Sequence, residues 1–379
     1  MVEVHGHCSD RFEPVRAQFQ NQFAIGGELG ASIAVLVDGV FEVDLWGGWT
    51  DAERTTPWAE DTITNVWSTT KTMVSLAALT LIERGELDPS APVSRYWPEF
   101  AEAGKADIEV RQLMGHTSGL SGWEQPITLE DLYDWPRSTG LLAAQEPWWK
   151  PGTASGYHAL TLGHLVGEVI RRITGQRTGE FLAAEIAGPL RADFHIGLDP
   201  KDFHRVANVI PPAGLLVDVS KLDPNGLAVR TFSNPVADAT ASWTDGWRTA
   251  DIGAGNGHGN ARSVARLQGV VSHGGELDGV RLLSPATVDR IFEIQSDGVD
   301  LVLNVPIRFG LGYGLPLPAL MPMLAGRRVC FWGGWGGSLV FNDVDRRVTV
   351  AYVMNEMGSD LLGKPSAMTC VGTALRLLG

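Results

Sequence analysis

The two ends of the chain carry the patterns that most strongly constrain its fold. Near the N-terminus, residues 31–37 and 40–46 are two apolar runs that flank the pair Asp38-Gly39. Asp-Gly between two such runs is among the strongest short-range signals for a β-hairpin with a tight turn. We therefore expect an antiparallel pair of strands in this segment.

The C-terminal end repeats this arrangement. Its apolar runs predict three strands, at residues 328–332, 338–342 and 347–354. The pair Asn342-Asp343 is expected to turn one of these hairpins. Helices are predicted at both extremes, over residues 9–23, with Ser9 or Asp10 as cap, and over residues 365–378. Together the two ends indicate an α/β (α+β) fold in which one antiparallel sheet with flanking helices forms from both chain ends.

The middle of the chain has a different pattern. Helices are predicted there at residues 108–114, 129–135, 160–173 and 180–190, between loops rich in glycine and proline. Residues 197–260 are mostly irregular in pattern, and a loop-rich region of this size more often lines a site than forms a linker. We expect two domains with an active-site cleft between them. They are a discontinuous sheet domain of residues 1–95 and 265–379 and a mainly helical insertion domain of residues 96–264.

Composition and charge exclude several classes of function. The 379 residues are 44% apolar and 20% charged, as in an ordinary globular protein. Acidic residues outnumber basic ones by 44 to 30, and the net charge of −14 argues against nucleic acid and anionic membranes as partners. Cys8, Cys330 and Cys370 are too isolated for a zinc site or an even disulfide framework. We expect no metal and no organic cofactor.

The sequence lacks several motifs that would indicate a particular location or a particular catalytic chemistry. The N-terminal residues lack the basic start and apolar run of a secretory signal, and no stretch is long and apolar enough to span a membrane. A cytoplasmic location without a membrane partner is expected. The chain has no Gly-x-Ser-x-Gly nucleophile elbow and no His-Glu-x-x-His motif, which argues against an α/β-hydrolase triad and a zinc hydrolase.

A lysine near the start of an apolar helix is the first indication of chemistry. Residues 69–84, closed by Gly85, form a helical pattern that is apolar on nearly every face and so predicts a buried helix. Ser68 and Lys71 are three residues apart and should point the same way. A buried lysine is costly when charged and unpaired, and a neutral or hydrogen-bonded amine can take a proton from a neighbouring hydroxyl. The plain alternative is a serine N-cap followed by a lysine that extends to solvent.

Four motifs, in order along the chain, match those of a known family. They are Ser68-Thr69-Thr70-Lys71, a His-Thr-Ser-Gly-Leu loop within residues 112–120, the run from Pro151 to Tyr157, and Trp332-Gly333-Gly334 on a predicted C-terminal strand. In these motifs the chain resembles the serine β-lactamase and penicillin-binding-protein superfamily, and within it the class C β-lactamase-like carboxylesterases of family VIII. The resemblance implies a β-lactamase-like fold.

The resemblance also implies a role for each matching residue. Ser68 would be the nucleophile that forms an acyl-enzyme, and Lys71 and Tyr157 would share the work of general base and acid. The backbone N–H groups of Ser68 and Trp335 would form the oxyanion hole. The residues of this third motif and its edge are Trp332, Gly333, Gly334 and Trp335.

Departures from the family pattern concern the substrate. β-Lactamases of this class carry Tyr-x-Asn, whereas here His158 and then Ala159 follow the tyrosine. Their third motif supplies a cation for the antibiotic's carboxylate, and this chain has Trp332 instead. Two polar contacts that favour a penicillin are therefore missing, and sites that need such pairs discriminate strongly. The sequence predicts a serine carboxylesterase that acts on small, uncharged esters of short acids or aryl alcohols.

Several alternatives stay open at this stage. The same chemistry could serve acyl transfer to a small alcohol, weak β-lactamase or D-alanyl peptidase activity, or no activity in a protein that keeps only the fold. A homo-oligomer is also open. Residues that could line the substrate pocket, although such residues are more often core, are Trp123, Trp148, Trp149 and His158. His116 is expected to stabilise its loop rather than act as a base.

Overall fold

A nine-stranded antiparallel sheet is the centre of the molecule. The structure is a computed structural model that describes residues 2–212, 223–359 and 363–378. The strand order is β1-β3-β2-β14-β13-β12-β11-β10-β9. The strands are β1 (Val4–Cys8), β2 (Gly30–Val37), β3 (Val40–Gly48), β9 (Ser296–Val299), β10 (Pro306–Phe309), β11 (Gly314–Leu315), β12 (Val329–Gly333), β13 (Leu339–Asp343) and β14 (Val348–Met354). The prediction of one sheet from both chain ends is confirmed, because β2 pairs with β14.

The predicted N-terminal hairpin forms as expected. Asp38 and Gly39 connect β2 to β3 with φ angles of 48° and 84°. Two consecutive residues with positive φ give a turn whose twist matches that of the flanking strands, which is why Asp-Gly is favoured there. This turn joins β2 to β3, and the C-terminal strands extend the sheet from β2.

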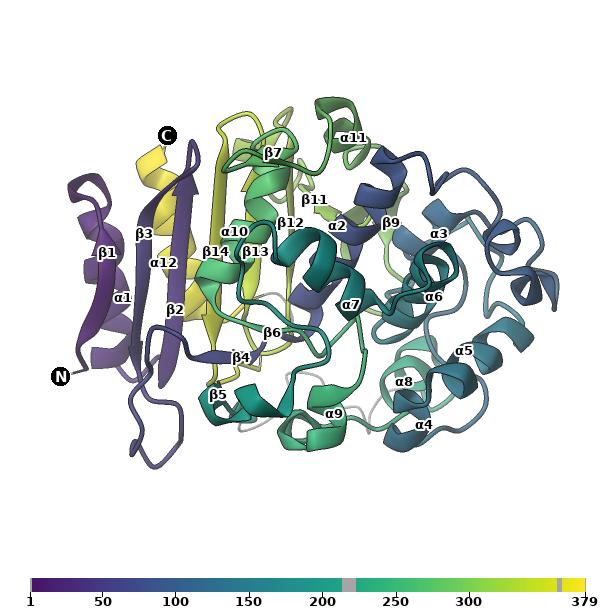
Figure 1. Cartoon of the computed structure of the whole chain (residues 1–379), viewed down its shortest axis with the longest axis horizontal. Helices are drawn as coiled ribbons and strands as arrows, with labels where there is room; N and C mark the ends of the chain where they lie inside the picture. Colours follow the sequence, from purple (N-terminus) through teal and green to yellow (C-terminus); the bar gives the residue numbers. More distant parts are fainter. Residues whose placement is uncertain (1, 213–222, 360–362, 379) are drawn as a thin grey trace.

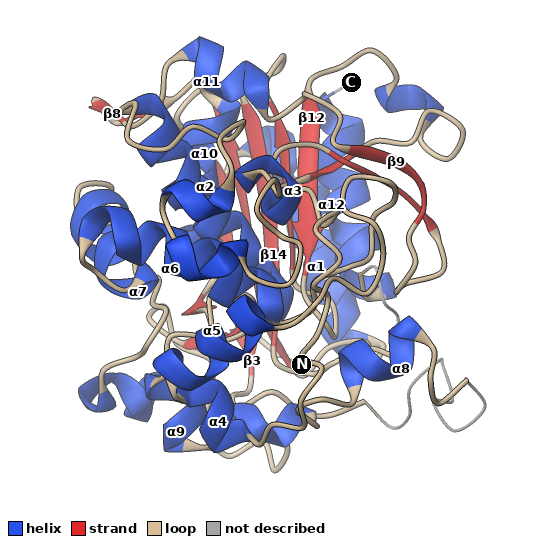
Figure 2. Ribbon diagram, turned by 90° about the vertical axis from the view of Figure 1, so that its right-hand side faces the viewer, coloured by secondary structure: helices blue, strands red, loops and turns tan. Residues whose placement is uncertain are grey.

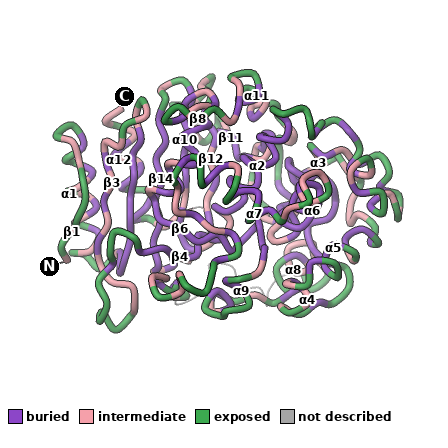
Figure 3. Tube along the Cα trace, in the orientation of Figure 1, coloured by how far each residue is buried: buried purple, intermediate pink, exposed green. Residues whose placement is uncertain are grey.

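Helices cover both faces of this sheet (Figure 1). On one face, α10 (Ala261–Ser272) packs against β2, β13 and β14. On the other face, α1 (Glu13–Ala24) and α12 (Pro365–Leu378) pack against each other and against sheet strands. All seven residues of β14 are therefore buried, and the buried colour runs along the central strands in Figure 3. A strand that is buried on both faces is expected to have a mostly apolar sequence without alternation, and β2 and β14 have such sequences.

Two local predictions at the chain ends are wrong. Asn342 and Asp343 lie inside β13, and the chain reverses at residues 344–347. Asn342 is fully buried and its amide oxygen accepts a hydrogen bond from the Thr349 hydroxyl at 2.9 Å, so it joins two strands instead of turning between them. At the other end, Ser9 makes no capping hydrogen bond, because a short 3₁₀ turn intervenes before α1 begins at Glu13.

The middle of the chain forms a cluster of helices beside the sheet (Figure 2). They are α2 (Thr70–Glu83), α3 (Val110–Met114), α4 (Leu129–Tyr133), α5 (Trp135–Ala144), α6 (Thr161–Thr174), α7 (Thr178–Leu182), α8 (Leu227–Phe232) and α9 (Asp245–Thr249). The helix predicted over residues 129–135 ends early, as α4, at Tyr133. Asp134 then starts a second helix, α5, by accepting a hydrogen bond from the backbone N–H of Arg137. The predicted helix over residues 180–190 is α7 followed by a π-helical turn, Ala183–Ala187.

The two-domain division remains a proposal. Its boundary between residues 264 and 265 falls inside α10, and a boundary before Ala261 would keep that helix on the sheet that it covers. After α10, Ser284 caps α11 (Pro285–Arg290) by accepting a hydrogen bond from the backbone N–H of Thr287. Within the described part of the chain, every helix is too short or too polar to cross a bilayer.

Candidate active site

Ser68 lies on a sharp turn between a strand and a buried helix. The strand is β4 (Ile63–Asn65), which pairs with β6 (His258–Gly259), and the helix is α2. Trp67 has a φ of 47°, a left-handed conformation that is uncommon for a residue other than glycine. The next residue, Ser68, is half-buried although its neighbours on both sides are buried. The turn therefore leaves the Ser68 side chain accessible at the edge of the core.

Lys71 contacts Ser68, as the spacing predicts. Its Nζ lies 2.9 Å from Ser68 Oγ and donates hydrogen bonds to the carbonyl oxygens of Ala159 at 2.7 Å and Ala254 at 2.8 Å. Lys71 is only 2% exposed, so the alternative of a lysine that extends to solvent is wrong. Burial lowers the pKa of Lys71 well below its usual 10.5, because the charged form loses its hydration.

Tyr157 completes the group that the motifs predict. Its ring centroid lies 4.8 Å from Lys71 Nζ, and its hydroxyl accepts a long hydrogen bond, 3.4 Å, from Trp332 Nε1. Burial raises the pKa of Tyr157 to about 12, although hydrogen bonding with the side chains of Ser68 and Trp332 opposes the rise. The side chains of Ser68 and Lys71 therefore meet that of Tyr157, which is distant in sequence, with an amine biased toward its neutral form and a phenol biased toward its protonated form.

The turn between β12 and β13 packs directly against the Ser68 segment. Ser338 donates a hydrogen bond to the carbonyl oxygen of Val66 at 2.8 Å, and its hydroxyl is 2.9 Å from that of Thr69. A side chain on Gly334 would place its Cβ 2.1 Å from the same Val66 oxygen, so only glycine allows this approach. Trp335 packs on Trp67, with ring centroids 5.0 Å apart. The third motif thus brings backbone from β12 beside Ser68.

The four candidate pocket residues fall into two groups. Trp123 is 2% exposed and donates from Nε1 to the carbonyl oxygen of Ser138, which makes it a core residue. His158 is fully buried, and both of its ring nitrogens are hydrogen-bonded, to the Gly156 carbonyl and to the Ser118 hydroxyl. The polar atoms of these two residues are thus already satisfied inside the protein, and their contact with substrate remains a prediction.

Trp148 and Trp149 are both partly exposed. Trp148 donates to Glu124 at 2.6 Å and stacks under the Arg230 guanidinium, 4.0 Å away. Trp149 packs under Gly156, where a Cβ would approach its ring to 2.4 Å, and so supports the backbone that leads to Tyr157. Their exposed parts leave substrate contact as a prediction.

His116 stabilises its loop, as expected. Its Nδ1 accepts a hydrogen bond from the backbone N–H of His158 at 3.0 Å, and its carbonyl accepts one from Gly156 at 2.9 Å. Burial lowers the pKa of His116 well below 6.5, and the neighbouring His158 and Lys71 lower it further. The neutral ring packs against Tyr157, with ring centroids 5.1 Å apart.

One residue near the site was not anticipated. Asp300 is fully buried, and its Oδ1 accepts a hydrogen bond from the backbone N–H of Tyr157 at 3.0 Å. The two residues are 143 positions apart, and no motif includes Asp300. The only sequence signal is an aspartate among apolar residues 301–303, which is compatible with many surface turns.

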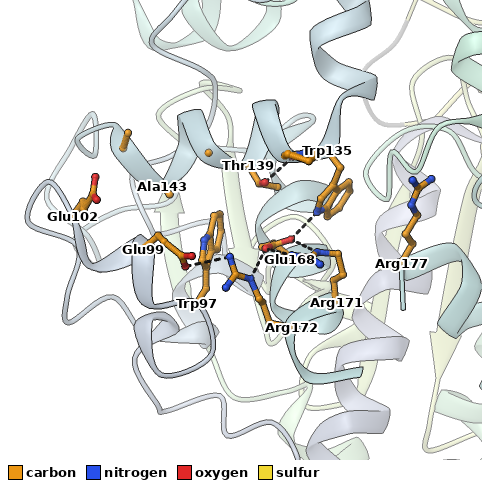
Figure 4. Close-up of a pocket in the computed structure, with 13 residues that line it drawn as sticks. Trp97, Glu99, Glu102, Trp135, Thr139, Ala143, Glu168, Arg171, Arg172 and Arg177 are labelled. Carbon is orange, nitrogen blue, oxygen red and sulfur yellow. Dashed lines mark hydrogen bonds and ion pairs between the residues drawn. The ribbon is translucent and has the colours of Figure 1, made fainter. Parts of the chain in front are cut away.

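A cavity of about 500 Å³ lies elsewhere, among the helices, and Ser68 does not line it (Figure 4). Glu168 is one of its lining residues, is 2% exposed and forms ion pairs with Arg171 and Arg172, both at 2.7 Å. Glu168 also accepts a hydrogen bond from Trp135 Nε1 at 2.6 Å. Glu99 supplies a second carboxylate, 3.1 Å from Arg172. The hydrogen bond from Trp135 to Glu168 ties α5 to α6.

Comparisons with known proteins identify the family of the chain. Residues 15–368 match the model of the Beta-lactamase family. Esterase/beta-lactamase LipL from Mycobacterium tuberculosis is 35% identical over 95% of this chain and 84% of its own length. Among solved structures, a family VIII carboxylesterase has a TM-score of 0.92 and 36% identity, covering 99% of this chain and 100% of its own. A penicillin-binding-protein homologue from Caulobacter crescentus gives the same values. The chain therefore belongs to the Beta-lactamase family, and it is a serine hydrolase of the carboxylesterase type.

Proposed function

We propose that this esterase cleaves small, uncharged esters of short acids or aryl alcohols through an acyl-enzyme at Ser68. The observation that carries the proposal is the environment of Lys71 Nζ. It has three polar neighbours, namely Ser68 Oγ at 2.9 Å and the carbonyl oxygens of Ala159 and Ala254. The two carbonyl oxygens and the Ser68 hydroxyl have different parts in the proton transfer.

Lys71 acts as the base in its neutral form. A neutral amine has two N–H bonds and one lone pair, and the two carbonyl oxygens can accept both N–H groups. The lone pair is then left for the Ser68 hydroxyl. Because burial lowers the pKa of Lys71 well below 10.5, the neutral amine is favoured. Lys71 takes the Ser68 proton while Oγ bonds to the ester carbonyl carbon.

The carbonyl oxygen becomes an oxyanion in this step. We assign its stabilisation to the backbone N–H groups of Ser68 and Trp335, and the close approach of Gly334 to Val66 supports the assignment. Donors fixed in advance stabilise the developing charge, and the loss of one typically costs about 100- to 1000-fold in rate.

Tyr157 acts as the acid. A phenol with a pKa of about 12 stays protonated at neutral pH and can donate to the leaving alkoxide as the carbon–oxygen bond breaks. The resulting phenolate recovers a proton from the Lys71 ammonium, whose nitrogen lies 4.8 Å from the ring centroid. Both groups thereby return to their starting forms. Water then attacks the acyl-enzyme, and deacylation releases the acid and the Ser68 hydroxyl.

The preference for uncharged esters is inferred from the third motif. Trp332 is 7% exposed, and its ring centroid lies 5.4 Å from that of Tyr157. An indole at this position favours apolar acyl or aryl groups and offers no cation to a carboxylate. Ala159 likewise has no side-chain amide for a lactam substituent, so β-lactams should be poor substrates.

Ser68→Ala tests the proposal with p-nitrophenyl acetate as substrate. We expect turnover to fall by about 1000-fold or more, together with loss of the burst of p-nitrophenol and of the acyl adduct in the mass spectrum. Ser75→Ala is the matched control. Ser75 lies on α2, which follows Ser68, and is 3% exposed, but its hydroxyl donates to the carbonyl oxygen of Gly312. Unchanged turnover in a folded Ser68→Ala variant would refute the acyl-enzyme at Ser68.

Product analysis separates the related activities. With added small alcohols, a dominant ester product would make the protein an acyltransferase rather than a hydrolase. Nitrocefin turnover that approaches ester turnover would contradict the substrate assignment drawn from Trp332 and Ala159.

A further inference from the structure

We propose that Asp300 is a positioning residue that holds the backbone of Tyr157 in place for the reaction through a buried carboxylate. The inference rests on the proposed role of Tyr157 as the acid. Asp300 reaches no reacting atom itself and acts through the tyrosine.

The hydrogen bonds of Asp300 form a bridge between two distant segments. Its Oδ1 accepts from the backbone N–H groups of Tyr157 at 3.0 Å, Val302 at 2.9 Å and Leu303 at 2.9 Å. A second link is parallel to the first, because the N–H of Leu301 donates to the carbonyl oxygen of Ser155 at 2.8 Å. The turn at residues 300–305 therefore holds the chain on both sides of Gly156.

The same turn also packs against the tyrosine side chain. Tyr157 belongs to a small apolar cluster that is separate from the main core, with Leu303 and Val305 packed against it. The buried members of this cluster are Tyr157, Val302, Ile307, Phe309 and Trp332. The turn thus supplies both the hydrogen bond to the tyrosine backbone and part of the surface on which the ring lies.

The second carboxylate oxygen has a different environment. Oδ2 is buried and has no hydrogen-bond partner among the described residues. An unpaired buried oxygen is costly, and an asparagine could make the same Oδ1 hydrogen bonds. The hydrogen bonds to Oδ1 therefore do not by themselves require an aspartate. What the aspartate adds is a negative charge.

That charge acts on the phenol. Burial is the main cause of the raised pKa of Tyr157, and the Asp300 carboxylate raises it further because a phenolate beside it would be a second negative charge. The other groups that face Tyr157 are Lys71, His116, the Ser68 hydroxyl and the Trp332 indole. Of these groups, His116 is held neutral by burial. Asp300 thus adds to the bias toward the protonated phenol that burial creates, and it also holds the tyrosine backbone in place.

Two substitutions separate the hydrogen bond from the charge. Asp300→Ala removes both, and a tyrosine displaced by about 1 Å should lose about 100-fold in kcat. Asp300→Asn keeps the Oδ1 acceptor and should restore kcat to within a few-fold of the wild type. Without the charge, the pKa of Tyr157 should fall, and the alkaline limb of the kcat/KM profile should move to lower pH.

The ultraviolet absorbance of phenolate gives a direct readout of this shift. The chain has only 5 tyrosines, and Tyr157→Phe identifies the contribution of this one. Asp297→Asn and Asp297→Ala are the matched controls, since Asp297 is three residues away on β9 and pairs with Arg308 at the surface. Neither control should change kcat or the alkaline limb.

The outcomes distinguish this inference from the proposed function. If Asp300→Asn lost as much kcat as Asp300→Ala and left the alkaline limb unchanged, Asp300 would be a structural residue only and the proposal would fall. Wild-type kcat and an unchanged alkaline limb in both Asp300 variants would also overturn the role of Asp300. The acyl-enzyme mechanism is tested separately, because it stands if Ser68→Ala loses acylation. If Asp300→Ala does not fold, the test of the proposal is whether the alkaline limb of the kcat/KM profile moves to lower pH in Asp300→Asn.

Discussion

At the scale of single residues, the protonation of Lys71 should control the acid side of the pH–rate profile. Its pKa in the folded protein lies well below 10.5 because the amine is buried. Activity that needs the neutral amine is therefore present above this lowered pKa and is lost as the pH falls through it. Lys71→Arg keeps a cation that does not deprotonate, so we expect kcat/KM to fall by about 100- to 10,000-fold across the whole pH range.

The measurement is a pH profile of ester hydrolysis for both proteins. Lys105→Arg is a suitable control, because Lys105 is also buried but donates its hydrogen bonds to the backbone carbonyls of Glu102, Ala143 and Gln145 and has none with Ser68. A Lys71→Arg enzyme with the wild-type acid limb would show that another group is the base.

At the scale of elements, the turn from β12 to β13 should be intolerant of any side chain at its closest point. In Gly334→Ala the new Cβ would meet the Val66 carbonyl at 2.1 Å and Ser338 Oγ at 2.4 Å. The turn must then move away from Ser68, and with it the backbone assigned to the oxyanion hole. We expect a loss of about 100- to 1000-fold in kcat, the range for one misplaced donor.

Gly140→Ala is the matched control for this prediction. Gly140 lies in α5, and a Cβ there would meet nothing within 4 Å. It should leave kcat unchanged and stabilise the protein by up to about 1 kcal/mol, because alanine is the better helix former. Equal activity in the two variants would exclude the turn from transition-state stabilisation.

At the scale of the whole molecule, a buried ion pair ties the two ends of the chain together. Glu28, just before β2, accepts hydrogen bonds from Tyr352, from Ser366 and from Lys364, the last at 3.0 Å. Lys364→Met would leave this carboxylate without its cation, which typically costs about 3–5 kcal/mol in the free energy of unfolding. Thermal or urea unfolding at neutral pH would measure the loss.

The pH dependence of that loss follows from the pKa of Glu28. Burial raises this pKa above 4.5, although Lys364 opposes the rise. The folded state then binds a proton more readily than the unfolded state, so stability decreases as the pH rises through the folded pKa. Lys364→Met should therefore lose less stability at mildly acidic pH than at neutral pH. Glu28→Gln combined with Lys364→Met should recover part of the stability, and a double variant no better than the single one would argue against the ion pair as the cause.

Periodicity and motif spacing predicted a large part of this molecule. The hairpin at Asp38-Gly39, the buried helix α2 and the convergence of Ser68 with Lys71 depend on residues close together in sequence. Their patterns can be read because backbone geometry fixes which neighbours share a face. The resemblance to a known family supplied Tyr157 and the third motif, which spacing alone would not have joined to Ser68.

Only the tertiary structure decided the remaining features. The position of the C-terminal turn depends on the cross-strand bond between Asn342 and Thr349, and the burial of Trp123 and His158 depends on the helices packed around them. The link from Asp300 to Tyr157 spans 143 residues and has no local signature. Local sequence determines which elements form, whereas contacts between distant segments depend on how all of the elements pack, and no short pattern encodes that.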